Sequence, residues 1–327
     1  MAATATSVDP SDSIAAQRRG ILEMVIASVS LGILGPVASI AYTTGLSPTV
    51  FSALRAAIGA AILGAIVLLG LQPRARLGDL PVRQQRMLAA AVILNGLQNL
   101  ALFLAYGQMS VALVLIVFYL YPVIVTAASA ATGRDRLTQL RVAALALAMV
   151  GLALVLGAQV GPDAHATPAG VALAAFAALC HAGYYLVVRD GFPHVPALQA
   201  TSLVLAGGFV ISGIAALATL GTGMVGTWVA DPTAWAMILV AGTIGAAFPK
   251  VLVIRAVRAI GGTRASLVAL LEPVTGVVVA TLALGQTLEP QEIVGGATIL
   301  IAAALVQRRE PEPVAPARFD AEATALD

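Results

Sequence analysis

Apolar residues run along this chain in ten stretches, each close to the length that a helix needs to cross a lipid bilayer. A helix rises about 1.5 Å per residue, so about 20 residues span the ~30 Å hydrocarbon core. Glycine and proline residues, which interrupt helices, mark the joints between the stretches. The pattern therefore predicts helices over 21–43, 48–70, 87–108, 110–132, 138–158, 168–189, 197–219, 234–257, 263–284 and 290–307.

The composition agrees with a chain surrounded by lipid. Hydrophobic residues make up 59% of the 327 positions and charged residues only 10%, with a mean hydropathy of +0.95. A soluble domain carries about 25% charged residues, so an ordinary soluble fold is excluded. The polar tails, 1–20 and 308–327, are rich in Ala, Asp, Glu and Pro. Such segments bury too little apolar surface to fold, and we expect both tails to be disordered.

The arginines predict how the chain is oriented in the membrane. If the N-terminus is cytoplasmic, every joint on the inner side contains arginine and every joint on the outer side contains none. This distribution satisfies the positive-inside rule at each joint, whereas a missed or additional helix would place arginines outside. We therefore predict ten spans with both termini in the cytoplasm. The arginines of the inner joints are Arg74, Arg76, Arg83, Arg86, Arg134, Arg136, Arg141, Arg189, Arg258 and Arg264.

One pattern occurs twice, around Tyr121-Pro122 and around Glu272-Pro273. When the two prolines are aligned, residues 107–137 fall against 258–288 at one constant offset. Each copy belongs to a block of five apolar stretches, and two blocks with an odd number of spans must insert in opposite orientations. The fold class predicted is an all-α integral membrane protein with two inverted five-helix repeats. Their bounds are 21–158 and 168–307, and secondary transporters with this plan bind substrate between the repeats.

Glu272 is one of three charged residues, with Arg55 and Lys250, that lie well inside the predicted spans. A charge at a helix centre costs about 2.5–3.5 kcal/mol on insertion scales, so a functional role is the default reading. Pro273 removes a backbone donor and predicts a break in the helix beside Glu272. The carboxylate could bind a substrate ammonium, exchange a proton, or pin two helices together.

Lys250 is the only lysine of the chain and follows Pro249, a further predicted helix break. It lies at a depth similar to that of Glu272, so the two residues could form a pair. Alternatively, the side chain of Lys250 snorkels, so that its aliphatic part stays in the apolar region and its amine reaches the inner surface. Arg55 has two possible roles. It either binds the anionic group of a substrate, since a planar guanidinium fits a carboxylate with two hydrogen bonds, or it orients its helix against neighbouring helix ends.

Tyr121 occupies in the first repeat the place that Glu272 occupies in the second, and Pro122 is the corresponding helix break. We expect Tyr121 to line the cavity between the repeats. Tyr119, two residues earlier, is expected to face a different side of its helix.

Uncharged polar residues offer secondary candidates. Gln98 and Asn99, with Asn95 one turn earlier, either join helices by hydrogen bonds or line the cavity. His181, beside Tyr184 and Tyr185, titrates near neutrality when it is solvated and is otherwise a packing residue.

Motifs of other functional classes are absent from the sequence. It contains no glycine-rich phosphate loop, no His-Glu-x-x-His and no Gly-x-Ser-x-Gly, and its three histidines are scattered. Cys180 is the single cysteine, so neither a disulfide framework nor a cysteine-based metal site is expected. The arginines follow the membrane topology without interleaved aromatic residues, so nucleic-acid binding is not expected. We predict no cofactor, no metal and no enzymatic activity.

The repeated segments resemble a known family. Residues 105–133, through Tyr121-Pro122, and residues 270–273 with 284–288 look like the repeats of the drug/metabolite transporter superfamily, and more narrowly of its EamA-type members. Leu46-Ser47-Pro48 with Phe51 and Arg55 is similar to the entry of that family's second helix. The resemblance covers about 21–307.

The resemblance implies a ten-helix fold around a central cavity, and export of amino acids, related metabolites or, in some members, drugs. One departure stands out: the family commonly shows Leu-Gly-Glu after the proline-bearing helix, but here that acid position holds Gln286 in the second half and Asp135 in the first. We expect a secondary-active exporter of a small metabolite, foremost an amino acid or a related compound, that works in the plasma membrane by alternating access, with proton coupling through Glu272 as a hypothesis. The alternatives are a passive facilitator or drug exporter of the same fold and, outside transport, an intramembrane sensor or enzyme.

Overall fold

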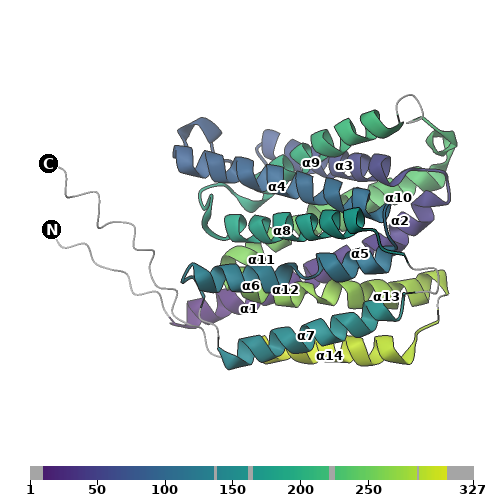
Figure 1. Ribbon diagram of the computed structural model, residues 1–327. Coiled ribbons are helices and arrows are strands. Elements are labelled where there is room, and N and C mark those ends of the chain that lie inside the picture. Colours follow the sequence, from purple (N-terminus) through teal and green to yellow (C-terminus); the bar gives the residue numbers. More distant parts are fainter. Residues whose placement is uncertain (1–9, 136–137, 161–164, 221–224, 286, 308–327) are drawn as a thin grey trace, which may run out of the picture.

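The computed structural model describes residues 10–135, 138–160, 165–220, 225–285 and 287–307, and these are helices and their joints without a strand. Each of the ten predicted helices is found with its ends within a few residues, except that the first begins earlier. The α-helices of Figure 1 are α1 (Pro10–Gly32), α2 (Leu34–Tyr42), α3 (Pro48–Leu68), α4 (Val82–Tyr106), α5 (Val111–Phe118), α6 (Tyr121–Ala131), α7 (Gln139–Gly157), α8 (Pro168–Asp190), α9 (Ala197–Leu220), α10 (Pro232–Gly242), α11 (Phe248–Ile260), α12 (Gly262–Ala269), α13 (Leu271–Leu284) and α14 (Pro290–Gln307).

These helices make ten crossings, because four of the crossings are built from two consecutive pieces. Among the described residues, nine crossings are long and apolar enough to span a membrane, and the apolar part of the tenth, Pro290–Leu305 in α14, is shorter. The fold is therefore the predicted all-α membrane architecture with two repeats.

The helix ends follow local chemistry. Ser47, Thr167 and Asp231 each precede a proline at the first helical position and accept a hydrogen bond from a backbone N–H of the first turn.

The first helix differs from expectation: α1 begins at Pro10, so residues 10–20, which we assigned to the polar tail, are helical. Ala15, Ala16 and the residues after them have high helix propensity and extend the apolar helix outwards. Residues 1–9 and 308–327 of the predicted tails lie outside the described residues.

The two repeated segments break at equivalent places. α5 ends at Phe118 and α6 begins at Tyr121, while α12 ends at Ala269 and α13 begins at Leu271. Both ends of α12 follow those of α5 at the offset that aligns the two prolines. Proline cannot donate the backbone hydrogen bond that would continue the helix, so the predicted breaks at Pro122 and Pro273 are observed.

Two further interruptions lie in other crossings. A π-helical segment, Thr243–Ala247, separates α10 from α11 immediately before Pro249, where we predicted a break. The other, between α1 and α2 at Ile33, was not predicted. Pro36 explains it, since its nitrogen cannot donate to the carbonyl of Gly32 one turn earlier.

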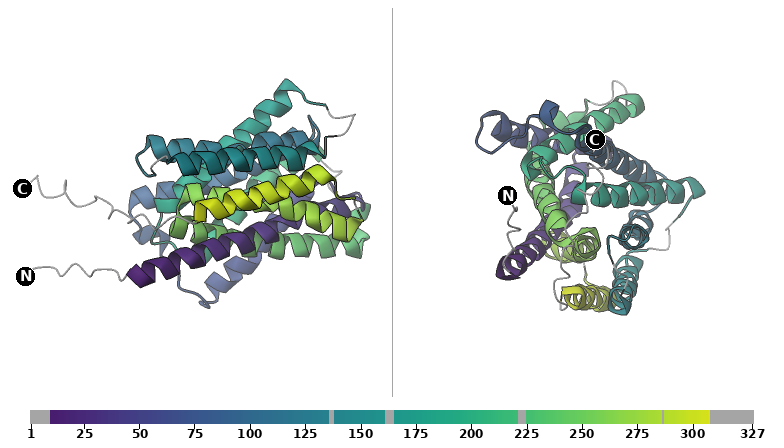
Figure 2. Two further views of the ribbon diagram at one scale, coloured as in Figure 1. Left: turned by 90° about the horizontal axis from the view of Figure 1, so that it is seen from below. Right: turned by 90° about the vertical axis from the view of Figure 1, so that its left-hand side faces the viewer.

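The most extensive helix contacts join one repeat to the other. α1 packs on α11 and α4 on α8, a pair of contacts related by exchange of the two repeats, while α3 packs on α9 and α7 on α14. Figures 1 and 2 show the paired helices side by side in one bundle. Gly151 in α7 and Gly295 in α14 face each other so closely that a Cβ on either would lie within 2.7 Å of the other's carbonyl oxygen. Small residues thus allow the backbones to touch, as is common in membranes.

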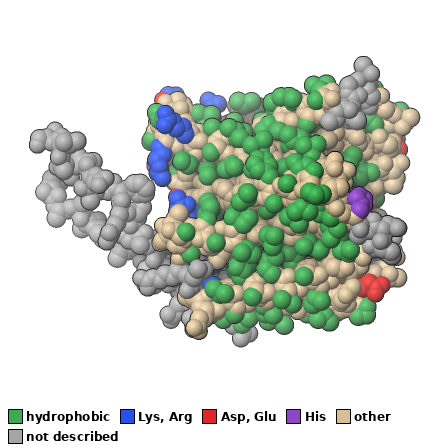
Figure 3. Space-filling view, in the orientation of Figure 1, with side chains coloured by type: hydrophobic (Ala, Val, Ile, Leu, Met, Phe, Trp, Pro, Cys, Tyr) green, Lys and Arg blue, Asp and Glu red, His purple; other side chains and the backbone are tan. Residues whose placement is uncertain are grey.

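The surface separates into an apolar body and a basic end. In Figure 3, hydrophobic side chains cover the middle of the visible face, and Lys and Arg gather at the left, the end where α1 begins and α14 ends in Figure 1. We call this the arginine-rich end. The apolar belt is the surface that a bilayer would cover, so the chain is a multi-pass membrane protein.

Candidate functional site

The three charged residues of the spans converge near the middle of the bundle. Arg55 is seven residues into α3 from one end, whereas Lys250 is ten residues from the arginine-rich end of α11 and Glu272 ten residues beyond the start of α12. At 1.5 Å per residue these positions lie about 10–15 Å deep. All three side chains are only partly buried, so each retains surface that a ligand could contact.

Two asparagines on α4 connect the two cations. Arg55 Nη2 donates to Asn99 Oδ1 at 3.1 Å, and Asn99 Nδ2 donates to the carbonyl oxygen of Asn95 at 2.8 Å. The ammonium of Lys250 in turn donates to Asn95 Oδ1. The hydrogen-bonded series Arg55–Asn99–Asn95–Lys250 therefore joins α3, α4 and α11. Gln98 is buried on α4 and, within the described part of the chain, bonds to neither cation.

Glu272 is the second residue of α13, and its carboxylate lies near the hydroxyl of Tyr119 and the cations Lys250 and Arg55. Within the described residues no ion pair joins Lys250 to Glu272, so the pair that we considered is not formed directly. The ammonium instead lies against Asn95 and 5.4 Å from the ring centre of Tyr184, a cation–π distance.

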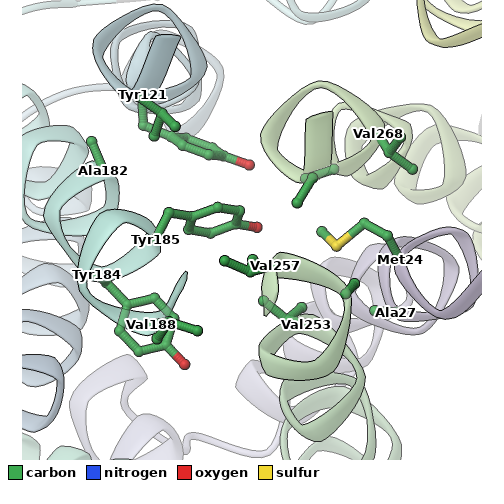
Figure 4. Close-up of a cluster of buried hydrophobic side chains, with 14 of the residues drawn as sticks. Met24, Ala27, Tyr121, Ala182, Tyr184, Tyr185, Val188, Val253, Val257 and Val268 are labelled. Atoms are coloured by element: carbon green, nitrogen blue, oxygen red, sulfur yellow. The ribbon is translucent and has the colours of Figure 1, made fainter. Parts of the chain in front are cut away.

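Aromatic rings fill the space beside the charges. The ring centres of Tyr121 and His181 lie 4.5 Å apart at nearly a right angle, and those of Tyr121 and Tyr185 lie 5.5 Å apart. In Figure 4 the hydroxyls of Tyr121 and Tyr185 point the same way, toward α11 and α12. Edge-to-face contacts of this kind fix ring orientations, and the cluster presents polar hydroxyls beside apolar ring faces.

Both repeats are recognised by one family model. It is the model of the EamA-like transporter family, and it matches residues 18–157 and 168–308. This chain belongs to the EamA-like transporter family. Since Tyr121 lies in the first matched stretch and Glu272 in the second, the cluster of this EamA-like transporter is built by both of its repeats. The bounds that we set for the repeats, 21–158 and 168–307, stay a prediction.

Comparison with solved structures agrees at the level of fold. A crystal structure of a protein superimposes on this EamA-like transporter with a TM-score of 0.69, covering 89% of this chain and 96% of the other at 19% identity. At that identity the likeness shows the fold alone. No curated protein matches the chain.

Three buried polar atoms of the cluster have no hydrogen-bond partner among the described residues: Arg55 Nε, His181 Nδ1 and the Tyr184 hydroxyl. An unpaired buried polar group costs about 1–3 kcal/mol. A polar ligand that satisfied these atoms would recover that cost, so they are the groups of this EamA-like transporter best placed for recognition.

Sequence reasoning missed part of the site. Tyr42 in α2 and Tyr106 in α4 lie close enough to Arg55 to interact with it electrostatically, so tyrosines of α2 and α4 also approach the charged residues. The expectation that Tyr119 faces away from Tyr121 is wrong. The helix is interrupted between them, and their ring centres lie 6.2 Å apart.

The backbone is irregular where the functional side chains lie. Tyr121 and Glu272 adjoin the two equivalent helix breaks, and Lys250 follows the π-helical segment. Non-helical backbone at membrane depth is tolerated where protein or a water-filled cavity surrounds it, and π-segments occur frequently at functional sites. Gly32 adds to this arrangement: a Cβ there would lie 2.7 Å from the carbonyl oxygen of Glu272. The absence of a side chain at Gly32 therefore lets α1 approach the break.

The site offers no evident place for a metal. Within the described residues, no three His, Cys, Asp or Glu side chains gather closely enough to hold an ion. Cys180 is buried one residue before His181. Gln286, which we noted at the family's acid position, lies outside the described residues, and Asp135, its counterpart, lies at the arginine-rich end.

Proposed function

We propose that this EamA-like transporter exports a small zwitterion of the amino-acid class from the cytoplasm across the plasma membrane, by alternating access coupled to protons. The observation that supports this is the juxtaposition of two cations, Arg55 and Lys250, with one acid, Glu272, beside a cluster of tyrosines and near the helix breaks of both repeats.

The chemistry of the cluster matches an amino acid. A guanidinium binds a carboxylate in bidentate geometry, and Arg55 Nε has no partner among the described residues, beside the bond of Arg55 to Asn99. Glu272 offers the opposite charge for a substrate ammonium. The ring faces of Tyr121, Tyr185 and His181 offer apolar surface for a side chain, and the unpaired Tyr184 hydroxyl offers a polar contact.

Contacts between the repeats bridge the arginine-rich end, which we assign to the cytoplasm. Asp135 of the first repeat accepts a hydrogen bond from Thr263 Oγ1 of the second at 2.7 Å and pairs with Arg189 at 3.5 Å. Glu23 of the first repeat pairs with Arg255 of the second at 2.5 Å. These contacts must break for the cluster to open toward the cytoplasm, which supports access from one side at a time.

Substrate counterflow tests the proposal without requiring knowledge of the driving force. Proteoliposomes are loaded with one unlabelled amino acid at a time, and uptake of a trace of the same labelled compound is measured. We expect counterflow with a subset of amino acids, loss of it in Glu272→Gln and Arg55→Gln, and no change in Glu289→Gln, which neutralises an exposed acid outside the cluster. Absence of counterflow with every amino acid, in protein shown to be folded, would refute the substrate class.

Proton coupling is tested by imposing a pH gradient on the same vesicles. A coupled carrier drives the labelled substrate against its own gradient when protons flow the opposite way, so the parent protein should accumulate more substrate with the gradient than without it. If the vesicles contain the same steady-state amount of labelled substrate with and without the gradient, the protein is a passive facilitator.

A further inference from the structure

A groove on the bundle surface combines an apolar wall with unpaired positive charge. It lies between α3 and α9, has a volume of about 440 Å³, and opens beside the joint that follows α3. Its wall on α3 includes Ala60 and Gly64, one turn apart, and a Cβ on Gly64 would meet no atom within 4 Å. Small side chains at these positions leave the groove open.

Two arginines lie at the mouth of the groove. Arg74 and Arg76 both line it and are exposed, and among the described residues neither forms an ion pair or a side-chain hydrogen bond. Asp79, the acid nearest to them in sequence, pairs with neither within the same residues. The segment that bears them is nonetheless fixed, because the Gln199 side chain of α9 bonds both the N–H and the C=O of Ala75, at 2.8 and 2.9 Å.

The mouth lies at the level of lipid headgroups. Leu68, Leu69 and Leu71, at the end of α3, have 76%, 73% and 66% of their surface exposed. A run of exposed leucines is stable only when lipid covers it, and the arginines follow it directly in sequence. Cationic side chains just outside an apolar belt on the basic side of a membrane protein attract anionic headgroups.

We propose that the groove between α3 and α9 binds an anionic phospholipid of the inner leaflet. Part of one acyl chain lies along Ala60, Gly64 and Leu203, and the phosphate lies between Arg74 and Arg76. This site is separate from the charged cluster of the transport site and does not depend on what the protein transports.

A neighbouring groove provides an internal comparison. It lies between α3, the π-helical segment and α11, has a similar volume of about 370 Å³, and includes one cation, Arg255. That guanidinium is already paired with Glu23 at 2.5 Å. Since its charge is compensated, this groove has an apolar wall without a free anion-binding group. Of the two grooves, we therefore expect only the one with Arg74 and Arg76 to prefer an anionic headgroup.

Native mass spectrometry of the detergent-purified full-length chain tests the proposal. The protein is titrated with phosphatidylglycerol or with phosphatidylcholine of identical acyl chains, and bound lipids are counted. We expect tighter binding of phosphatidylglycerol, and a loss of about 10- to 30-fold in its affinity in the double variant Arg74→Gln/Arg76→Gln, since each arginine near an anionic headgroup contributes roughly one decade or less. Inorganic phosphate should not displace the lipid.

Two further variants separate the contributions of charge and groove. Arg18→Gln/Arg86→Gln removes the same number of exposed charges from the arginine-rich end outside the groove and should keep the preference. Gly64→Leu fills the groove without removing charge and should weaken binding of phosphatidylglycerol, whereas Gly157→Leu, at an exposed position of α7, should not. An unchanged lipid preference in the Arg74/Arg76 variant, an equal loss in the Arg18/Arg86 control, or displacement by inorganic phosphate would overturn the proposal.

Discussion

Replacing Asp135 by Asn should open the arginine-rich end more often. The Asp135 carboxylate is the junction at which Thr263 and Arg189 of the second repeat meet the first repeat. Asn keeps one oxygen for the Thr263 hydroxyl but loses the negative charge. The side chains of Arg189 and Asp135 are 21% and 17% exposed, so solvent screens their pair to about 0.2–1 kcal/mol. The bond from the buried Thr263 to a charged acceptor contributes about 1.5–3 kcal/mol, of which Asn retains a part.

Together these losses amount to about 1–2 kcal/mol, which corresponds to a 5- to 30-fold larger open population. Ser129 provides a reporter on α6, because its side chain has no exposed surface and its hydroxyl has no partner among the described residues. The assay is the rate of maleimide labelling of Ser129→Cys in a Cys180→Ala background, which should rise 5- to 30-fold with Asp135→Asn.

Asp190→Asn is the matched control for this experiment. Asp190 pairs with the same Arg189, at 3.7 Å, but both residues lie on α8 and their pair does not connect the repeats. Its replacement should leave the labelling rate within twofold of the parent. Equal rates in Asp135→Asn and Asp190→Asn would refute the reasoning that Asp135 holds the repeats together at this end.

Two other substitutions test how the cluster is held. Lys250→Met keeps the length and apolar contacts of the side chain but removes the donor to Asn95; we expect loss of counterflow with little change in thermal stability, and wild-type counterflow would contradict a role in the site. Gly32→Ala places a Cβ 2.6 Å from Thr275 Cβ and 2.7 Å from the Glu272 carbonyl oxygen, so we expect a loss of about 1–3 kcal/mol from overpacking, measured as a lower unfolding temperature. Gly35→Ala, where a Cβ would meet no atom within 4 Å, should unfold as the parent does.

The membrane itself explains why the architecture could be predicted from the sequence. Lipid allows only fully hydrogen-bonded segments of a set length, so apolar stretches give the helices, and a repeated proline gives the equivalent breaks. The break at Ile33 is not marked in the hydropathy pattern, because apolar residues continue on both sides of Pro36. The earlier start of α1 was missed because hydropathy marks where lipid contact begins and does not mark where helix begins.

The composition of the site could be predicted only in part. Arg55, Lys250 and Glu272 were identified because charge inside a span is costly. Asn95 and Asn99 could be named from polarity, but their roles as partners of the cations depend on how α4 packs against α3 and α11. Tyr42, Tyr106 and the other tyrosines come from helices far apart in sequence, and their convergence follows from packing that local pattern does not encode.

The two equivalent helix breaks carry different side chains, Tyr121 in one repeat and Glu272 in the other. In a carrier with inverted repeats, exchanging the conformations of the repeats interconverts the two end states. With identical side chains these states would be related by a two-fold rotation axis in the membrane plane, with equal affinities on the two faces. Here the carboxylate belongs to one repeat only, so the states differ in where negative charge lies. Half-saturation concentrations measured from opposite faces should therefore be unequal, even in vesicles without any gradient to drive net flux.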